Sequence, residues 1–279
     1  MTQATRRTKI IQWIETRRHQ LRESPWARFI PVHFLNHYVI PLISPGGKKA
    51  YDSRSYWDRW YAQAREFSDG ITVDDQYNPL FVRYHYNSTE NSLIRYFARQ
   101  PLAQPTVLDI GSGAGHWISF YREVFHAEHV TGVDTSASCI SALRDKFLDV
   151  PNIKIEECDI SAPNVTFEKS FDIINAIGVM FHIVEDDAWE RALRTLAAAL
   201  KPNGVIAIGG HFGWITQNVQ FFGPQENPHA FVYKRVRSLR SWRNMAAKCG
   251  LIVVGLERTT SSRGIRTPQN NILFLKHRQ

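Results

Sequence analysis

At 279 residues, with 43% hydrophobic and 22% charged side chains, the chain has the composition of an ordinary globular protein and suits one core domain with elaborations. Its net charge of +8 would suit an anionic partner, but half of that excess lies in residues 1–23, so a basic amino-terminal arm explains it as well as a nucleic-acid surface does. Three widely spaced cysteines without a CxxC pair, and eleven histidines without HExxH spacing, argue against a disulfide framework, imply no metal site and favour a reducing, cytoplasmic compartment.

Residues 1–100 are expected to form an amino-terminal extension of helices and turns, rich in aromatic residues, that caps the rest of the chain. Residues 9–21 have the spacing of a short amphipathic helix. The apolar stretch Phe29 to Ile43 is too short, and too broken by Pro31 and Pro41, to span a bilayer. We expect it to cover the core, with peripheral membrane contact as the alternative.

Two further helices are predicted before the core. The first spans residues 53–67, and its Tyr56, Trp60 and Tyr61 would share one face. The second starts at Ser88 and would turn Leu93, Tyr96 and Phe97 inward.

From Thr106 the pattern changes to alternating strands and helices. Strands are predicted for TVLDI, HVTGVD, IKIEECDI, FDIINAIG and VIAIGG, and helices for GHWISFYREVF, SASCISALRDKFL and DDAWERALRTLAAAL. After an irregular insert at about residues 211–237, a helix ends at Gly250 and two strands close the chain. This order predicts an α/β, doubly wound sheet for residues 101–279.

The stretch VLDIGSGAGHW, residues 107–117, places a glycine-rich loop directly after the first strand. In the dinucleotide fingerprint G-x-G-x-x-G the third glycine would stand where this chain has His116. Asp109 would also repel a pyrophosphate, whereas it would attract a cofactor that carries a cationic sulfonium. Glycines without a Cβ would let such a cofactor approach the backbone closely.

VLDIGSGAG resembles the first motif of the class I, Rossmann-like S-adenosylmethionine-dependent methyltransferases, and VTGVDTS, CDI and FDIINAIGVMFHIVEDD are similar to the motifs that follow it. The resemblance covers Thr106 to about Gly210 well, covers the closing helix and strands moderately, and does not reach residues 1–85. It implies a seven-stranded, mostly parallel sheet of order 3-2-1-4-5-7-6 with the last strand antiparallel. It also implies S-adenosylmethionine as cofactor and S-adenosylhomocysteine as product.

The resemblance also assigns cofactor-binding residues to successive motifs. They are Asp109, Gly111, Ser112 and Gly113 in the glycine loop, Asp134 and Thr135 at the ribose, Asp159 and Ile160 at the adenine, and Asn175 and Ala176 on the methionine side.

The acceptor is expected to be a small, partly apolar organic molecule methylated at oxygen or nitrogen. Family members that methylate exocyclic amines of nucleic-acid bases carry [DNS]-P-P-[FYW] in the fourth motif, whereas Asn175 is followed here by Ala176, Ile177 and Gly178. The insert is rich in aromatic residues (Phe212, Trp214, Phe221, Phe222, Phe231 and Tyr233), which favours an apolar pocket. The basic residues of 233–243 fit a solvated helix face.

Transfer to a hydroxyl needs help with loss of a proton, whereas a neutral amine needs only positioning. Candidate bases are His182, just past the fourth strand, His211, just past the fifth, and Tyr86, ahead of the core. His116 and Trp117 are expected to pack beside the cofactor.

Two alternatives remain open at this point. The acceptor would be a protein, RNA, glycan or lipid if the basic arm recruits it, or the chain would bind the cofactor as a non-catalytic module. The sequence names neither the acceptor nor the oligomeric state.

Overall fold

The computed structural model describes residues 52–62, 67–69, 79–210, 212–213, 215–222, 231–259 and 271–278, with backbone alone for Phe81, 217–222 and 231–233. All of them belong to one of the two compact units of the chain, Ala50–Gln279. The predicted helix over 9–21, the apolar stretch 29–43 and His211 lie outside the described residues. No helix among the described residues is long and apolar enough to cross a bilayer.

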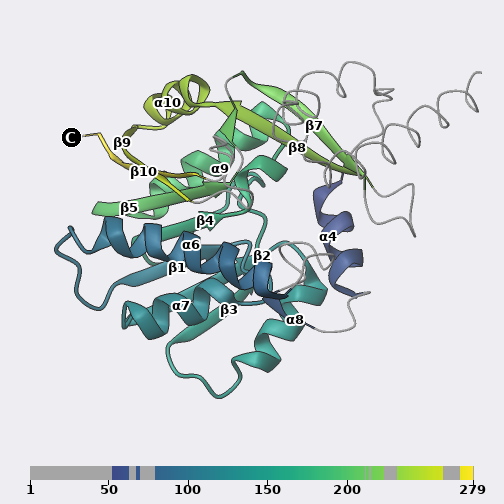
Figure 1. Cartoon of the computed structure of the whole chain (residues 1–279), viewed down its shortest axis with the longest axis vertical. Helices are drawn as coiled ribbons and strands as arrows, with labels where there is room; N and C mark the ends of the chain where they lie inside the picture. The colour runs from purple at the N-terminus through teal and green to yellow at the C-terminus, as the bar shows by residue number, and fades with distance from the viewer. Residues whose placement is uncertain are drawn as a thin grey trace, which may run out of the picture. The chain divides into compact units, whose positions relative to one another are not determined.

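A seven-stranded sheet forms the centre of the described unit (Figure 1). Its strands are β1 (Thr106–Ile110), β2 (His129–Asp134), β3 (Ile153–Glu157), β4 (Phe171–Ile177), β5 (Leu200–Gly210), β9 (Leu251–Arg258) and β10 (Asn271–His277). They follow the order β3-β2-β1-β4-β5-β10-β9, in which β10 is antiparallel to both of its neighbours and the other pairs are parallel. This is the predicted order, because β9 and β10 are its sixth and seventh strands.

Helices cover both faces of the sheet (Figure 1). One face packs against α6 (Pro79–Phe97), α7 (His116–Val124) and α8 (Ala137–Lys146), and the other against α9 (Asp186–Ala199) and α10 (Leu239–Lys248). Neighbouring residues of one strand, such as Val107 and Leu108, are buried in the two opposite core layers. The inner strands therefore read as continuous apolar runs, as parallel strands covered on both faces do.

The helix α6 begins at Pro79, nine residues before the predicted start at Ser88. Proline suits a first helical turn, because its missing N–H has no partner to lose there and its φ is already helical. The aromatic and β-branched residues that follow have modest helix propensity, which is why the pattern did not reveal this part. Burial of Val82 and Tyr86 in the core layer under α6 outweighs that propensity.

The insert is not irregular, as the sequence suggested, but forms a second, three-stranded sheet. Its strands β6 (Phe212–Gly213), β7 (Gln217–Phe222) and β8 (Phe231–Ser238) follow the order β6-β8-β7, with β7 and β8 antiparallel. β-Branched and aromatic residues along FVYKRV favour a strand, and pairing with β7 decides the outcome. We refer to these two antiparallel strands as the β7–β8 pair.

Removing a core side chain should show how strongly the layer under α9 holds the fold. Leu193 is fully buried there, so we expect Leu193→Ala to lower the free energy of unfolding by about 2–5 kcal/mol, the range for a deleted core leucine. Leu148 is 78% exposed and provides the matched control, for which Leu148→Ala should stay within about 0.5 kcal/mol. Urea unfolding followed by circular dichroism measures both, and equal losses would contradict the assignment.

Candidate functional site

The glycine loop leaves β1 through three left-handed residues. Gly111, Gly113 and Gly115 have φ of +64°, +51° and +82°, where a side chain would strain the backbone. The loop is held to β2 because the amides of Gly111 and Ser112 both donate to the carbonyl of Val133, at 2.7 and 3.1 Å. A Cβ on Gly111 would come within 2.4 Å of Val179, so the loop also lies tightly against the turn that follows β4.

Asp109 lies beneath this loop as a fully buried carboxylate. It is in register with Asn175 on β4, whose amide donates to Asp109 Oδ1 at 2.7 Å, and Tyr121 in turn donates to Asn175 Oδ1 at 3.1 Å. Burial raises the pKa of Asp109 to about 7 against the opposing hydrogen bond from Asn175. Among the described residues Asp109 Oδ2 has no hydrogen-bond partner, so the site holds a buried oxygen suited to a cationic or hydrogen-bonding group.

Asp134 ends the neighbouring strand β2, on the other side of the loop. Its carboxylate accepts from the amides of Gly113 at 3.2 Å and Ser136 at 3.0 Å, and its side chain is almost fully buried. Burial raises the pKa of Asp134, against these hydrogen bonds. The structure therefore brings together four parts of the predicted cofactor site: Asp109, the glycine loop, Asp134 and Asn175.

The predicted adenine pair is placed differently. The strand β3 ends at Glu157, so Asp159 and Ile160 follow it rather than belong to it. Asp159 is exposed, and its Oδ1 accepts from the backbone amide and the hydroxyl of Ser161, at 2.8 and 2.6 Å. Ile160 is buried in the core layer next to α9.

The helix α4 (Ser53–Ala62) lies at the edge of the sheet where the parallel strands β2 and β3 end (Figure 1). Asp58 accepts from the Ser136 hydroxyl and the Ser138 amide, both at 3.0 Å, and so caps the start of α8. Arg54 forms an ion pair with Glu157 at the end of β3. Contacts of α4 thus extend from the end of β3 to the helix after β2, and through Trp57 to the turn after β4.

His182, a predicted base, ends the short 3₁₀ helix η3 (Met180–His182) after β4. Its ring packs between Trp57 of α4 and Phe181, at centroid distances of 5.0 and 4.4 Å. Tyr86, also a predicted base, is buried in α6 with its ring 3.7 Å from that of His116. His182 therefore lies at the edge of the site under α4, and Tyr86 lies beside the first residue of α7.

His116 itself makes contacts that sequence reasoning missed. Its Nδ1 lies 2.7 Å from Asp69 Oδ2, and its Nε2 lies 2.7 Å from Glu90 Oε1. Asp69 and Glu90 are 47 and 26 positions away in the chain, and no spacing rule joins them to a glycine loop. The expectation that His116 packs beside the cofactor loop remains, with two carboxylates added.

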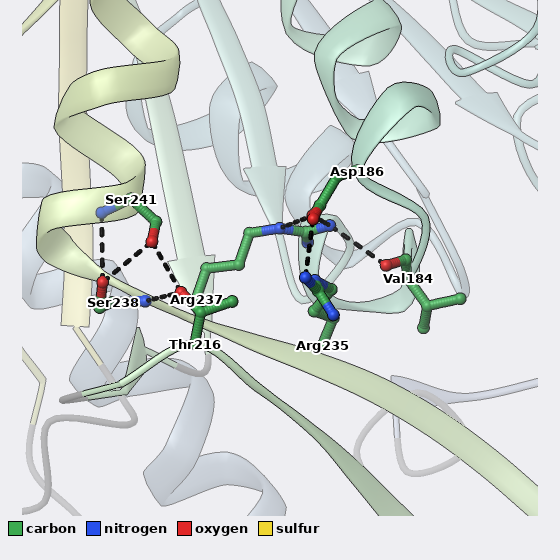
Figure 2. A network of polar contacts seen from close by, with 7 residues as sticks. All are labelled: Val184, Asp186, Thr216, Arg235, Arg237, Ser238 and Ser241. Carbon is green, nitrogen blue, oxygen red and sulfur yellow. Dashed lines mark hydrogen bonds and ion pairs between the residues drawn. The ribbon is translucent and has the colours of Figure 1, made fainter.

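The β7–β8 pair is fixed to the start of α9 by the two arginines of β8 (Figure 2). Arg235 and Arg237 both pair with the carboxylate of Asp186, at 2.7 and 3.1 Å. Arg237 is 1% exposed, and its guanidinium lies over the ring of Trp189 at 4.1 Å, so burial lowers its pKa to about 10 against the hydrogen bond that it donates to Asp186. Arg235 and Arg237 are thus ion-paired strand residues, whereas Arg240 and Arg243 lie exposed on α10, as the solvated helix face predicts.

A cavity of about 250 Å³ opens beside this ion pair, lined by Val184, Glu185, Asp186, Asp187 and Arg235. Its lining is mostly charged, and the apolar pocket expected from the aromatic residues of the insert stays a prediction. Of those aromatic side chains the structure describes Phe212, which is buried next to Trp242. In the described parts of the chain, no group of three or more His, Cys, Asp or Glu residues is arranged to hold a metal ion.

Comparison with known proteins agrees with this geometry. Residues 107–204 match the family described as "Methyltransferase domain". Trans-aconitate 2-methyltransferase of Paracidovorax citrulli is 28% identical over 133 residues, which cover 47% of this chain and 49% of that protein. The match therefore spans about half the length of this relative.

Solved structures share the fold at low sequence identity. The 1,6-didemethyltoxoflavin-N1-methyltransferase of Burkholderia thailandensis superposes with a TM-score of 0.58 and 17% identity, over 81% of this chain and 87% of that one. A glycopeptide N-methyltransferase gives a TM-score of 0.52 and 15% identity, over 68% of this chain and 87% of the other. At such identities the likeness establishes the fold and leaves the acceptor open.

The buried carboxylate makes a prediction about pH. A pKa of about 7 for Asp109 means that the native state holds a proton which the unfolded chain releases at lower pH, so stability falls as pH rises from about 4 through 7. The loss is of the order of 4 kcal/mol. Asp109→Asn cannot ionise, so its stability relative to the wild type should be clearly greater at pH about 8 than at pH about 5.

Urea unfolding of both proteins at the two pH values measures this difference. Asp149→Asn, at an exposed position, is the control and should follow the wild type. Parallel pH dependence in the wild type and Asp109→Asn would show that Asp109 is ionised normally in the native state.

Proposed function

We propose that this chain, whose core is a methyltransferase domain of the class I, S-adenosylmethionine-dependent family, transfers the methyl group of S-adenosylmethionine to an oxygen or nitrogen of a small, partly apolar organic acceptor. The observation that carries the proposal is the pair of buried carboxylates, Asp109 and Asp134, on the two sides of the glycine loop. The ionised form of Asp109 beneath the loop would repel a pyrophosphate and attract a cationic cofactor, while Asp134 would accept from hydroxyl groups.

The residues present fit this cofactor. Asp109 Oδ2 is buried without a hydrogen-bond partner among the described residues, just before the three left-handed glycines, and we assign it to the cationic methionine part of the cofactor. We assign the ribose hydroxyls to Asp134 and Thr135 at the end of β2, where the carboxylate of Asp134 is oriented by the amides of Gly113 and Ser136. Asn175 acts through Asp109: it holds the carboxylate in place and does not itself reach outward.

When bound, S-adenosylmethionine supplies a methyl group on a positively charged sulfur, which the acceptor receives as the carbon–sulfur bond breaks. The protein's tasks are to align the acceptor, exclude water and take up the proton that the acceptor loses. His182 is our first candidate for that proton because it lies in the turn after β4, beneath Trp57. His211 stays a candidate outside the described residues, and Tyr86 is the third, buried next to His116.

The acceptor class rests on the two segments that we propose as caps, residues 1–100 and the insert at about 211–237. Aromatic residues of α4, such as Trp57 and Trp60, already gather at the carboxyl edge of the sheet. A small acceptor also agrees with two of the similar proteins, which are named for trans-aconitate and for didemethyltoxoflavin. A cytoplasmic location and independence of metal ions are part of the proposal.

The donor site should bind S-adenosylhomocysteine in the micromolar range. Loss of the two ribose hydrogen bonds in Asp134→Ala should weaken binding by at least about a hundredfold, since hydrogen bonds to a charged group contribute about 1.5–3 kcal/mol each. Isothermal titration calorimetry measures both affinities. Asp145→Ala, on the exposed side of α8, should bind as the wild type does, and a folded wild type without binding would refute the proposed function.

Turnover separates the acceptor classes. The full chain and a version lacking residues 1–23 should release S-adenosylhomocysteine at similar rates with one set of small carboxylates, phenols and amines. A rate that depends on the basic arm, and on added protein, RNA or lipid, would instead indicate a macromolecular acceptor. Donor binding without product from any acceptor would indicate a non-catalytic module.

A further inference from the structure

His116 is the first residue of α7 and directly follows Gly115, the last glycine of the loop. Both of its ring nitrogens lie 2.7 Å from carboxylate oxygens, one from Asp69 and one from Glu90. A carboxylate can only accept a hydrogen bond, and a neutral imidazole can donate from only one nitrogen. The two contacts together therefore require a protonated ring, an imidazolium.

This imidazolium joins three segments that are far apart in the sequence. Asp69 belongs to residues 67–69, Glu90 to α6 and His116 to the start of α7. Its side chain is 19% exposed, and Tyr86 packs on the ring at 3.7 Å, where an aromatic face stabilises a cation. The same segment reaches α4, because Phe67 contacts Tyr61 at a ring distance of 6.0 Å.

The charge on His116 also acts on the donor site. Burial lowers the pKa of His116, but the hydrogen bonds to Asp69 and Glu90 outweigh burial and raise it. The imidazolium in turn lowers the pKa of Asp109, in opposition to burial and to the neighbouring charge of Asp134. It therefore favours the ionised form of the carboxylate that we assign to the cationic donor.

Two other titratable groups face this cluster from α6. The pKa of His85 is lowered by burial and then by the positive charge of His116. The ring of Tyr86 packs against the imidazolium at 3.7 Å. We assign the pH response of the cluster to His116 with its two carboxylates.

We propose that His116 is a positioning residue: held as an imidazolium between Asp69 and Glu90, it ties the amino-terminal segments to the glycine loop and raises the affinity of the site for the donor. This inference rests on the proposed function, because the donor defines the site that His116 supports. His116 itself has both nitrogens committed and is assigned no contact with the donor.

The test is the pH dependence of S-adenosylhomocysteine binding by the full chain, measured by calorimetry between pH about 5.5 and 9. In the wild type, affinity should fall at low pH as Asp109 becomes protonated. It should fall again at high pH as His116 loses its proton, because a raised histidine pKa keeps the charge through neutrality and loses it above. The amino group of the probe titrates alike in every variant, so differences between variants report on the protein.

His116→Gln keeps a polar side chain without the charge. We expect binding about tenfold weaker at pH about 7.5, because a smaller fraction of Asp109 is ionised once the neighbouring cation is gone. The fall at high pH that belongs to His116 should disappear. The fall at low pH should begin at higher pH than in the wild type, because Asp109 has lost a neighbouring cation. If His116 served packing alone, the fall in affinity at low pH would begin at the same pH in His116→Gln as in the wild type.

Glu90→Gln covers the case in which His116→Gln does not fold. It keeps an oxygen that can accept from Nε2 but removes one negative charge, so the fall at high pH should move to lower pH while affinity near pH about 6 stays within about twofold. His129 begins β2, at the end of the strand away from Asp134, so His129→Gln is the matched control and should reproduce the wild-type curve.

The outcomes separate the two proposals. If the wild type binds and both variants give its curve, His116 has no part in donor affinity and this inference is wrong. If affinity falls equally at all pH values in His116→Gln and Glu90→Gln leaves the curve unchanged, the role is structural only, which also overturns it. If the folded wild type does not bind, the proposed function fails and takes this inference with it.

Discussion

The carboxylate of Asp109 is fully buried, and the rest of the site is arranged around the cost of keeping it there. A buried carboxylate without partners would cost several kcal/mol. Asn175 and Tyr121 satisfy one of its oxygens through a chain of hydrogen bonds across β1 and β4, and the other oxygen is left open. Such an arrangement costs stability in the free protein, and a cationic ligand would remove the cost. This is the physical reason to connect the site with a sulfonium cofactor rather than with a phosphate.

The loop above Asp109 is held from three directions. The carbonyl of Val133 accepts hydrogen bonds from the loop and so ties it to β2. The side chain of Val179 lies close against Gly111 on the side of β4, and His116 binds the far end of the loop to α6 and to residues 67–69. None of these contacts is required by the sheet itself, since the strands pair without them. They position a loop of glycines that would otherwise have many accessible conformations.

Two segments outside the parallel strands approach the same edge. The helix α4 binds the start of α8 through Asp58 and meets His182 through Trp57, while β8 is fixed to the start of α9 by Arg237 and Asp186. A buried arginine stacked on Trp189 contributes modest stability compared with apolar packing, but it specifies one geometry. We propose that these two segments cap the core and govern which acceptor enters.

The strand order was implied by the resemblance to a known family, whereas the sequence alone determined the strands themselves, the glycine loop and the two carboxylates near the ends of β1 and β2. These features are local, because strand periodicity, the conformational freedom of glycine and the common edge of parallel strands fix them within a few residues. Tertiary structure decided the rest. His116 finds its carboxylates 47 and 26 positions away, Arg237 finds Asp186 at a distance of 51 positions, and α6 begins at Pro79 because burial outweighs propensity. Such pairs form when the sheet brings distant segments together, and no spacing in the chain encodes them.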